Sequence, residues 1–172
     1  MKFNREAYQI TLLTLLALAG GCTQPGEGDG QGKGKKGGGA QTTVVEMKEL
    51  MARNDGLVYK FREKEPYSGV ANEYYLYQQE EPPLRVRREF QGGKLHGKVT
   101  YYYNDGGLMI EIHYKEGKKT GEAKNWYKSG ALQWKRSFKN DVLDGDFIRY
   151  KPDGEITTHV IYTNGEVTQA IK

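Results

Sequence analysis

The residues able to act as acids, bases or metal ligands are scattered in this 172-residue chain. His96 falls in an expected turn, His113 takes an outward position on an expected strand, and His159 lies further along and out of step with it. None of them shares an expected face with a cysteine or a pair of carboxylates, as a catalytic triad or a zinc site requires. The sequence therefore predicts no catalytic residue, no metal or other cofactor and no small-molecule substrate. A hydrolase stays only as a distant alternative.

One acidic cluster, in the segment 141–146, has the chemistry to hold calcium. Asp141, Asp144 and Asp146 would supply the carboxylate oxygens that Ca²⁺ prefers. They do not follow the ligand spacing of an EF-hand loop. A solvated turn is therefore the favoured interpretation, and calcium binding is the alternative.

Aromatic and basic residues gather in two stretches that could bind a flat ligand. They are Tyr101, Tyr102, Tyr103, Trp126 and Tyr127, with Lys98, Lys124 and Lys128 beside them. Such a platform can stack sugars or the bases of single-stranded nucleic acid. The alternative is that aromatic side chains form packing ladders within a sheet, and we favour it for the column of Tyr102, Trp126 and Tyr150.

The aromatic and basic residues belong to a sequence unit that recurs every 24 residues between Gly97 and Gly165. The columns that keep this step are Gly97, Gly121 and Gly145; Tyr102, Trp126 and Tyr150; Gly106, Gly130 and Gly154; Leu108, Leu132 and Ile156; and Tyr114, Phe138 and Tyr162. A fixed period in this range is typical of a repeat array, in which each unit is stabilised by its neighbours.

Each unit has the pattern of two strands joined by short turns. Residues 98–103 form the first expected strand, and 104–107 supply a tight turn before the second strand, 108–115. A second turn, 116–121, starts the next unit. An earlier unit from Gly69 is 28 residues long, with four extra residues within Leu76 to Pro83. The sequence thus predicts an all-β fold, an elongated single-layer antiparallel meander of about four β-hairpin repeats.

One face of this sheet is predicted to carry apolar ladders, because apolar and polar residues alternate along the second strand of each unit. The predicted ladders are Leu84, Leu108, Leu132 and Ile156; Val86, Ile110, Trp134 and Thr158; and Phe90, Tyr114, Phe138 and Tyr162. Cross-strand pairs of this kind contribute about 0.2–1 kcal/mol each. Several units can therefore stabilise a sheet that one hairpin could not.

Residues 42–66 are expected to cap the first unit. The start of this segment is expected to form a short strand or a helical turn that ends at Asn54-Asp55-Gly56, a strong turn signal. Residues 57–62 alternate in the manner of a strand with one aromatic face. We expect this strand to cover the open edge of the array.

The N-terminus has the pattern of a secretory signal. Lys2 and Arg5 precede an apolar run, Ile10 to Ala19, which is too short to span about 30 Å of hydrocarbon as a helix. The stretch from Ala19 to Cys22 resembles the lipobox of bacterial lipoproteins, in which the cysteine is lipidated. Cys22 is the only cysteine, so an internal disulfide is excluded. The alternative is an ordinary signal peptide with an incidental cysteine.

The lipobox resemblance implies a membrane-anchored lipoprotein of the bacterial cell envelope, carrying palmitate or a similar acyl chain. Thr23 after the cysteine favours the outer membrane in a two-membrane bacterium. Residues 23–41 contain eight glycines and no aromatic residue, and such a chain is a disordered tether with a reach of about 25 Å. The predicted organisation is a signal peptide over 1–21, a lipidated tether over 22–41, a cap over 42–66 and repeats over 67–172.

The spacing Gly-x(4)-Tyr-Tyr-x-x-Gly-x-Leu-x(5)-Tyr-x-x-Gly-Lys-x-x-Gly, from Gly97 to Gly121, resembles the MORN-variant repeat. Two segments precede the repeats, Asp55 to Tyr59 and Pro66 to Gly69. Together with them, the chain from Asn54 to Val167 is similar to bacterial YwqK-type proteins. That resemblance implies a MORN-like sheet and, for many such proteins, the role of an antitoxin. Asp141 and Lys151 depart from the pattern, where other units have a glycine and an aromatic residue.

The sequence leaves a non-enzymatic interaction protein as the leading hypothesis. Its formal charge is +4, but both signs are interspersed, so we expect no nucleic-acid partner. The expected partner is an unknown protein or a cell-wall component, and the alternative is an antitoxin that neutralises a toxin. Tyr101 stays open as a binding residue, because its equivalents in later units are polar. The candidate interaction surface comprises Tyr77, Arg85, Arg87, Tyr101, Lys124 and Arg149.

Overall fold

The computed structural model describes residues 42–76 and 80–172. The predicted signal peptide, the predicted lipidation site Cys22, the predicted tether and Tyr77 lie outside these residues. No helix within the described ranges is long and apolar enough to cross a membrane.

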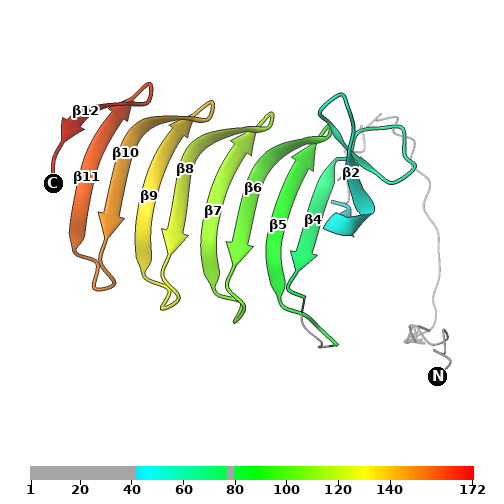
Figure 1. Cartoon of the computed structure of the whole chain (residues 1–172), viewed down its shortest axis with the longest axis horizontal. Helices are drawn as coiled ribbons and strands as arrows, with labels where there is room; N and C mark the ends of the chain where they lie inside the picture. The colour runs from blue at the N-terminus through cyan, green and yellow to red at the C-terminus, as the bar shows by residue number, and fades with distance from the viewer. Residues whose placement is uncertain (1–41, 77–79) are drawn as a thin grey trace, which may run out of the picture. The chain divides into compact units, whose positions relative to one another are not determined.

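The fold is one ten-stranded sheet with a separate two-stranded sheet at its N-terminal end (Figure 1). The elements are β1 (Val44–Glu46), the 3-10 helix η1 (Met47–Glu49), β2 (Leu50–Ala52), β3 (Val58–Lys60), β4 (Gly69–Tyr74), β5 (Leu84–Gln91), β6 (Lys94–Tyr102), β7 (Leu108–Lys115), β8 (Lys118–Trp126), β9 (Leu132–Lys139), β10 (Val142–Tyr150), β11 (Ile156–Thr163) and β12 (Glu166–Ala170). From β4 to β12 each strand pairs antiparallel with the next along the chain. The predicted single-layer antiparallel meander of hairpin repeats is confirmed.

Along one side of the sheet, the ends of consecutive strands are joined by two-residue turns that repeat from unit to unit. Both residues of these turns have positive φ, which matches a type I′ hairpin. The turns are Gly92–Gly93, Glu116–Gly117, Asn140–Asp141 and Asn164–Gly165. The second turn was predicted over 116–121, but β8 already begins at Lys118. The strands are therefore longer, and the turn shorter, than the glycine spacing predicts.

The second residue of each of these turns also ties its unit to the one before. The Gly117 amide donates to the Leu95 carbonyl at 2.8 Å, and the Gly165 amide donates to the Leu143 carbonyl at 2.8 Å. Asp141 takes the same place in the third unit, and its amide donates to the Lys119 carbonyl at 3.0 Å. Its carboxylate also accepts a bond from the Lys119 amide at 2.8 Å. This second bond explains how aspartate replaces the glycine of the repeat.

At the opposite ends of the strands, a tyrosine hydroxyl joins one unit to the next. Tyr75 donates to the Tyr102 carbonyl at 2.7 Å, Tyr103 to that of Trp126 at 2.7 Å, and Tyr127 to that of Tyr150 at 2.9 Å. We call these bonds the tyrosine clasps. The first clasp forms although the four-residue insertion lies just after Tyr75. In the next unit Lys151 replaces the tyrosine and pairs with Glu155 at 2.6 Å.

The strand register divides the side chains of β6 to β11 between two faces. One row across the sheet runs Val86, Tyr101, Ile110, Asn125, Trp134, Arg149, Thr158, and the next runs Arg88, Val99, Ile112, Ala123, Arg136, Phe147, Val160. We call the side that carries these rows the apolar face and the other side the polar face. The predicted ladder of Val86, Ile110, Trp134 and Thr158 is therefore confirmed as one row of the apolar face.

The N-terminal segment covers the apolar face at one end only. Val45, Tyr67, Ala71 and Phe90 form the buried core there, and Met47, Leu50, Val58 and Leu95 pack against it. The hydroxyl of Tyr67 donates to the Val70 carbonyl at 2.8 Å, and lies 3.0 Å from that of Thr43. Beyond this end the apolar face has no second layer among the described residues.

The prediction that residues 57–62 cover the open edge of the array is wrong. Within that segment only Val58–Lys60 forms a strand, β3, and it pairs with β2 in the small second sheet. The edge is covered instead by β1, which runs parallel to β4 with Val45 opposite Ala71. Val58 of β3 packs against the core, because Asp55 and Gly56 reverse the chain just before it.

Candidate binding face

The structure divides the predicted interaction residues between the two faces. Tyr101 and Arg149 lie in one row of the apolar face. Arg87 and Lys124 lie in a row of the polar face, through Thr100 and Glu111. Arg85 forms an ion pair with Glu73, which also pairs with Arg88 at 2.8 Å. The predicted residues therefore do not form one surface: Tyr101 and Arg149 share a row of the apolar face but lie four strands apart, and Arg87 and Lys124 share a row of the polar face.

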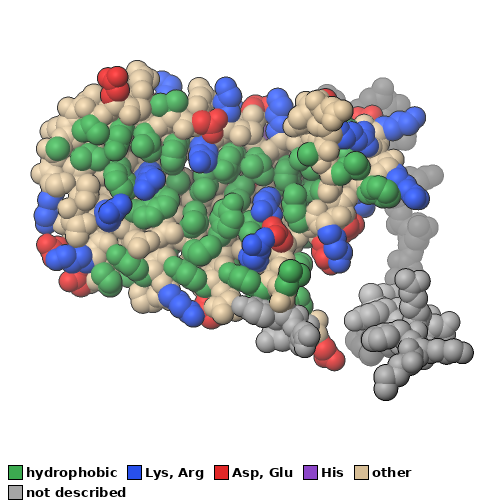
Figure 2. All heavy atoms as spheres, viewed as in Figure 1, with side chains coloured by type: hydrophobic (Ala, Val, Ile, Leu, Met, Phe, Trp, Pro, Cys, Tyr) green, Lys and Arg blue, Asp and Glu red, His purple; other side chains and the backbone are tan. Residues whose placement is uncertain are grey.

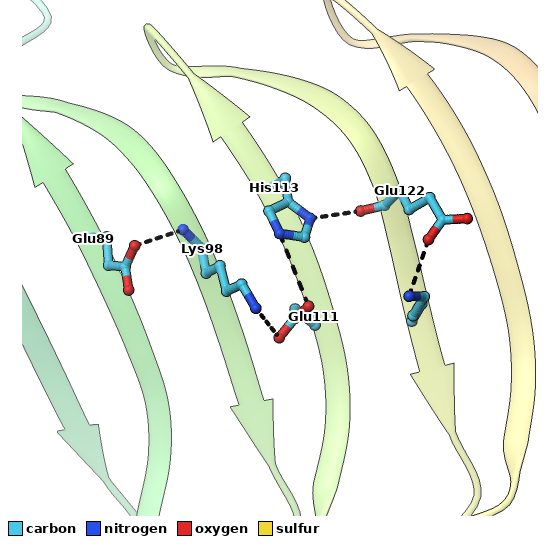
Figure 3. A network of polar contacts seen from close by, with 6 residues as sticks. Glu89, Lys98, Glu111, His113 and Glu122 are labelled. Atoms are coloured by element: carbon cyan, nitrogen blue, oxygen red, sulfur yellow. Dashed lines mark hydrogen bonds and ion pairs between the residues drawn. The ribbon is translucent and has the colours of Figure 1, made fainter.

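Several charges of the polar face are paired with one another (Figure 3). Lys98 pairs with Glu111 at 3.1 Å, and Lys124 pairs with Glu122 at 3.0 Å. Glu89 accepts a bond from the Lys98 amide at 3.0 Å, and His113 Nδ1 lies 2.9 Å from the Glu122 carbonyl oxygen. The hydrogen bond from Lys124 is the main cause that lowers the pKa of Glu122. Lys124 is thus engaged within the sheet rather than presented to a partner.

The apolar face has a different charge pattern. Its positions along β6 to β11 contain no aspartate and no glutamate, and their charged side chains are Lys119, Arg136 and Arg149. Figure 2 shows hydrophobic side chains gathered along the middle of the sheet with separate Lys and Arg side chains among them. Along β6 to β11 this face therefore combines exposed apolar area with positive charge and has no carboxylate at its strand positions.

The cations of the apolar face lie over aromatic rings. The Arg136 guanidinium is 4.5 Å from the Trp134 ring centre and 4.6 Å from that of Phe147. Arg149 lies over the same Phe147 ring at 5.7 Å. Lys119 lies 5.5 Å from the ring centre of Phe138. Cation–π contacts of this kind contribute about 0.5–1 kcal/mol at exposed sites, and more when desolvated.

Two polar atoms on this face are buried without a hydrogen-bond partner. They are Arg136 Nε and the side-chain oxygen of Asn125. Asn125 lies opposite Trp134, and Arg136 lies opposite Ala123, so the two side chains are close neighbours in the register. An unsatisfied buried polar group costs about 1–3 kcal/mol. The sheet therefore retains polar groups at a place where apolar side chains would be more stabilising.

The candidate interaction surface predicted from the sequence does not include Arg136, Trp134 or Phe147. The sequence predicts Trp134 in a packing ladder, and the register confirms that position. The signal that could have found Arg136 is its own column, in which Arg88, Ile112 and Val160 are its equivalents. Arg88 in this column is paired with Glu73, whereas Arg136 has no ion pair among the described residues, and an unpaired cation is unusual at a packing position.

The histidines and the acidic cluster take part in local bonds between strands and turns. His159 Nε2 lies 2.6 Å from the Asp146 carboxylate, and His96 Nδ1 lies 3.5 Å from that of Glu116. Asp144 accepts a bond from the Asn164 amide at 3.3 Å. Across residues 42–76 and 80–172, no group of three or more His, Cys, Asp or Glu is placed to hold a metal ion.

Comparison with known families adds to this geometry. The sequence model of the family described as "MORN repeat variant" matches residues 95–116. The chain contains a MORN repeat. The matched segment spans β6 and β7, which form one hairpin of the array, and the same hairpin recurs at the 24-residue step in β8–β9 and β10–β11. Comparison with curated proteins gave no match. The MORN repeats indicate a repeat protein involved in binding.

Proposed function

We propose that this MORN-repeat protein is a non-enzymatic binding protein of the bacterial cell envelope. A lipid on Cys22 would hold it at the membrane, and the apolar face of β6 to β11 would contact the partner. The partner would be a protein or a component of the cell wall. The lipobox resemblance supports the location, and the repeat sheet supports the binding role.

The observation that carries the proposal is the unequal cover of the apolar face. At β4 and β5 this face is the buried core, closed by the N-terminal segment. Along β6 to β11 the same rows continue with Tyr101, Ile110 and Trp134 only half-buried. A face that is core at one end and uncovered along the rest is a typical interaction surface, since soluble proteins rarely expose large apolar patches.

The location is tested by labelling cells with a fatty acid analogue. We expect label on the intact protein and none on the Cys22→Ser variant, with the intact protein recovered in the membrane fraction. Equal labelling of both proteins would exclude lipidation of Cys22. Recovery of an unlabelled protein from the cytoplasm would favour the alternative, a YwqK-like antitoxin that binds a cytoplasmic toxin.

The binding face is tested with a photo-crosslinking residue placed on either side of the sheet in living cells. A probe at Tyr101 reports on the apolar face, and a matched probe at Lys135 reports on the polar face. We expect the Tyr101 probe to yield a defined adduct and the Lys135 probe to yield none. Adducts from Lys135 alone would place the contact on the polar face and contradict the proposal.

A further inference from the structure

Two arginines of the apolar face converge on one aromatic ring without an acidic partner. Arg136 and Arg149 both lie over Phe147, at 4.6 and 5.7 Å, and Arg136 also lies over Trp134 at 4.5 Å. We call Trp134, Arg136, Phe147 and Arg149 the arginine–aromatic cluster. We propose that this cluster docks an acidic protein segment, in which carboxylates stand beside apolar side chains. The inference rests on the proposed binding role of the apolar face.

The first argument is charge. Neither guanidinium has an ion pair or a side-chain hydrogen bond within the described part of the chain. Like charges held near one ring repel each other, and an anion placed between them removes that repulsion. Stacking occupies the flat side of a guanidinium and leaves its N–H groups in the plane free for a carboxylate, which they bind in a bidentate manner.

The second argument is preorganisation. Trp134 and Arg136 lie two residues apart on β9, and Phe147 and Arg149 lie opposite them on β10. Arg136 Nε is buried, so the rings and the sheet hold the base of its guanidinium in place. Arginine and tryptophan in such fixed positions are the residues most often found to dominate protein interfaces. Binding would therefore lose little side-chain entropy here.

The third argument is the size of the uncovered face. Six strands at about 4.8 Å spacing, with four facing positions each, present roughly 700 Å². A standard protein interface buries about 800 Å² on each partner. A protein surface therefore fits the face better than a small ligand does. A second copy of this chain fits poorly, because the apolar face of its β6 to β11 would bring further cations and no carboxylate to Arg136 and Arg149.

The test selects short random peptides on the full-length protein, purified from membranes in mild detergent. We expect the selected peptides to be enriched in Asp or Glu next to aliphatic or aromatic residues. Their affinity should fall about tenfold or more in Arg136→Gln and in Arg149→Gln, as expected when one partner of a charge pair is lost. Arg136→Lys, which keeps the charge but loses the planar fork, should weaken binding less than Arg136→Gln.

Lys135→Gln is the control, since Lys135 is a cation of the polar face, opposite Lys124 in the register. It should leave peptide affinity unchanged. Urea unfolding of each variant shows whether a loss of binding reflects a loss of folding. Peptides without acidic enrichment, or acidic peptides that bind Arg136→Gln as tightly as the unaltered protein, would overturn the inference.

Two further probes separate the acidic protein segment from other anions. A single-stranded DNA oligonucleotide and vesicles of phosphatidylglycerol are tested against the same variants. Tighter Arg136-dependent binding to either probe than to any selected peptide would overturn the inference and assign the cluster to that anion. Crosslinks from Tyr101 with no effect of Arg136→Gln would leave the binding face standing and remove the arginine–aromatic cluster from it.

Discussion

The tyrosine clasps predict that a single hydroxyl measurably stabilises the array. Tyr103 donates to the Trp126 carbonyl at 2.7 Å, across the boundary between two units. Tyr103→Phe removes this bond, keeps the ring and leaves the carbonyl without the donor. An intramolecular hydrogen bond of this kind contributes about 1 kcal/mol to the free energy of unfolding. A loss of that size lowers the melting temperature of a domain this long by about 3–5 °C.

The assay is equilibrium unfolding in urea, followed by tryptophan fluorescence. Tyr162→Phe is the control, because the Tyr162 hydroxyl makes no hydrogen bond among the described residues and should change the unfolding free energy by less than about 0.5 kcal/mol. A triple variant with phenylalanine at Tyr75, Tyr103 and Tyr127 should lose about 3 kcal/mol of unfolding free energy, because the effects of distant substitutions usually add.

Equal unfolding free energies for Tyr103→Phe and Tyr162→Phe would refute the reasoning. That result would mean that the carbonyl of Trp126 bonds water as favourably as it bonds the tyrosine. The units would then be joined by strand pairing and side-chain packing alone. The loss of unfolding free energy in Tyr103→Phe should be about one third of the loss in the triple variant. A much larger share would instead show strong coupling between neighbouring units.

Two other substitutions test the structure at the cap and on the polar face. Gly69→Ala should destabilise the protein by more than about 2 kcal/mol in the same urea assay, because Gly69 has φ +149° and an added Cβ would lie 2.5 Å from the Thr43 carbonyl oxygen; unchanged stability would contradict the close packing of the cap. The pKa of Glu122 is lowered in the folded protein, chiefly by the hydrogen bond from Lys124. The ionised carboxylate therefore stabilises the fold at a pH above the pKa of Glu122 in the unfolded chain. This stabilisation is lost as the pH falls through the lower pKa of the folded state. Glu122→Gln should therefore cost under about 1 kcal/mol at neutral pH, because the pair is exposed, and the difference from the unaltered protein should vanish in acid; a difference that grows in acid would be inconsistent with this sign.

Much of the fold could be predicted because the repeat places the same requirement on each unit. The 24-residue columns mark the turns, and the alternation along 108–115 marks the two faces. The alternation also separates Tyr101 from Lys124, whose positions fall on opposite faces once the register is known. Residue types alone do not specify that register, so the predicted surface contains residues of both faces.

The arginine–aromatic cluster was harder to predict. Arg136 and Phe147 are 11 residues apart in the chain and meet only because β9 and β10 pair with a register shift between Leu143 and Phe147. A β-bulge of this kind changes which residues face each other across two strands, and the 24-residue spacing does not predict that partner. The proximity of Arg149 to the same ring follows from that pairing too.

By itself, the sequence determined a meander of hairpins, because turn chemistry and alternation are local properties that each unit repeats. Only the tertiary structure decided which end and which face of the sheet are covered. Both faces contain apolar residues, and the choice depends on where residues 42–66 pack. That packing joins Val45 to Ala71 and Phe90, contacts that no local pattern encodes. The cover over β4 and β5 leaves the apolar face of β6 to β11 open, and this is where the structure offers a surface for binding.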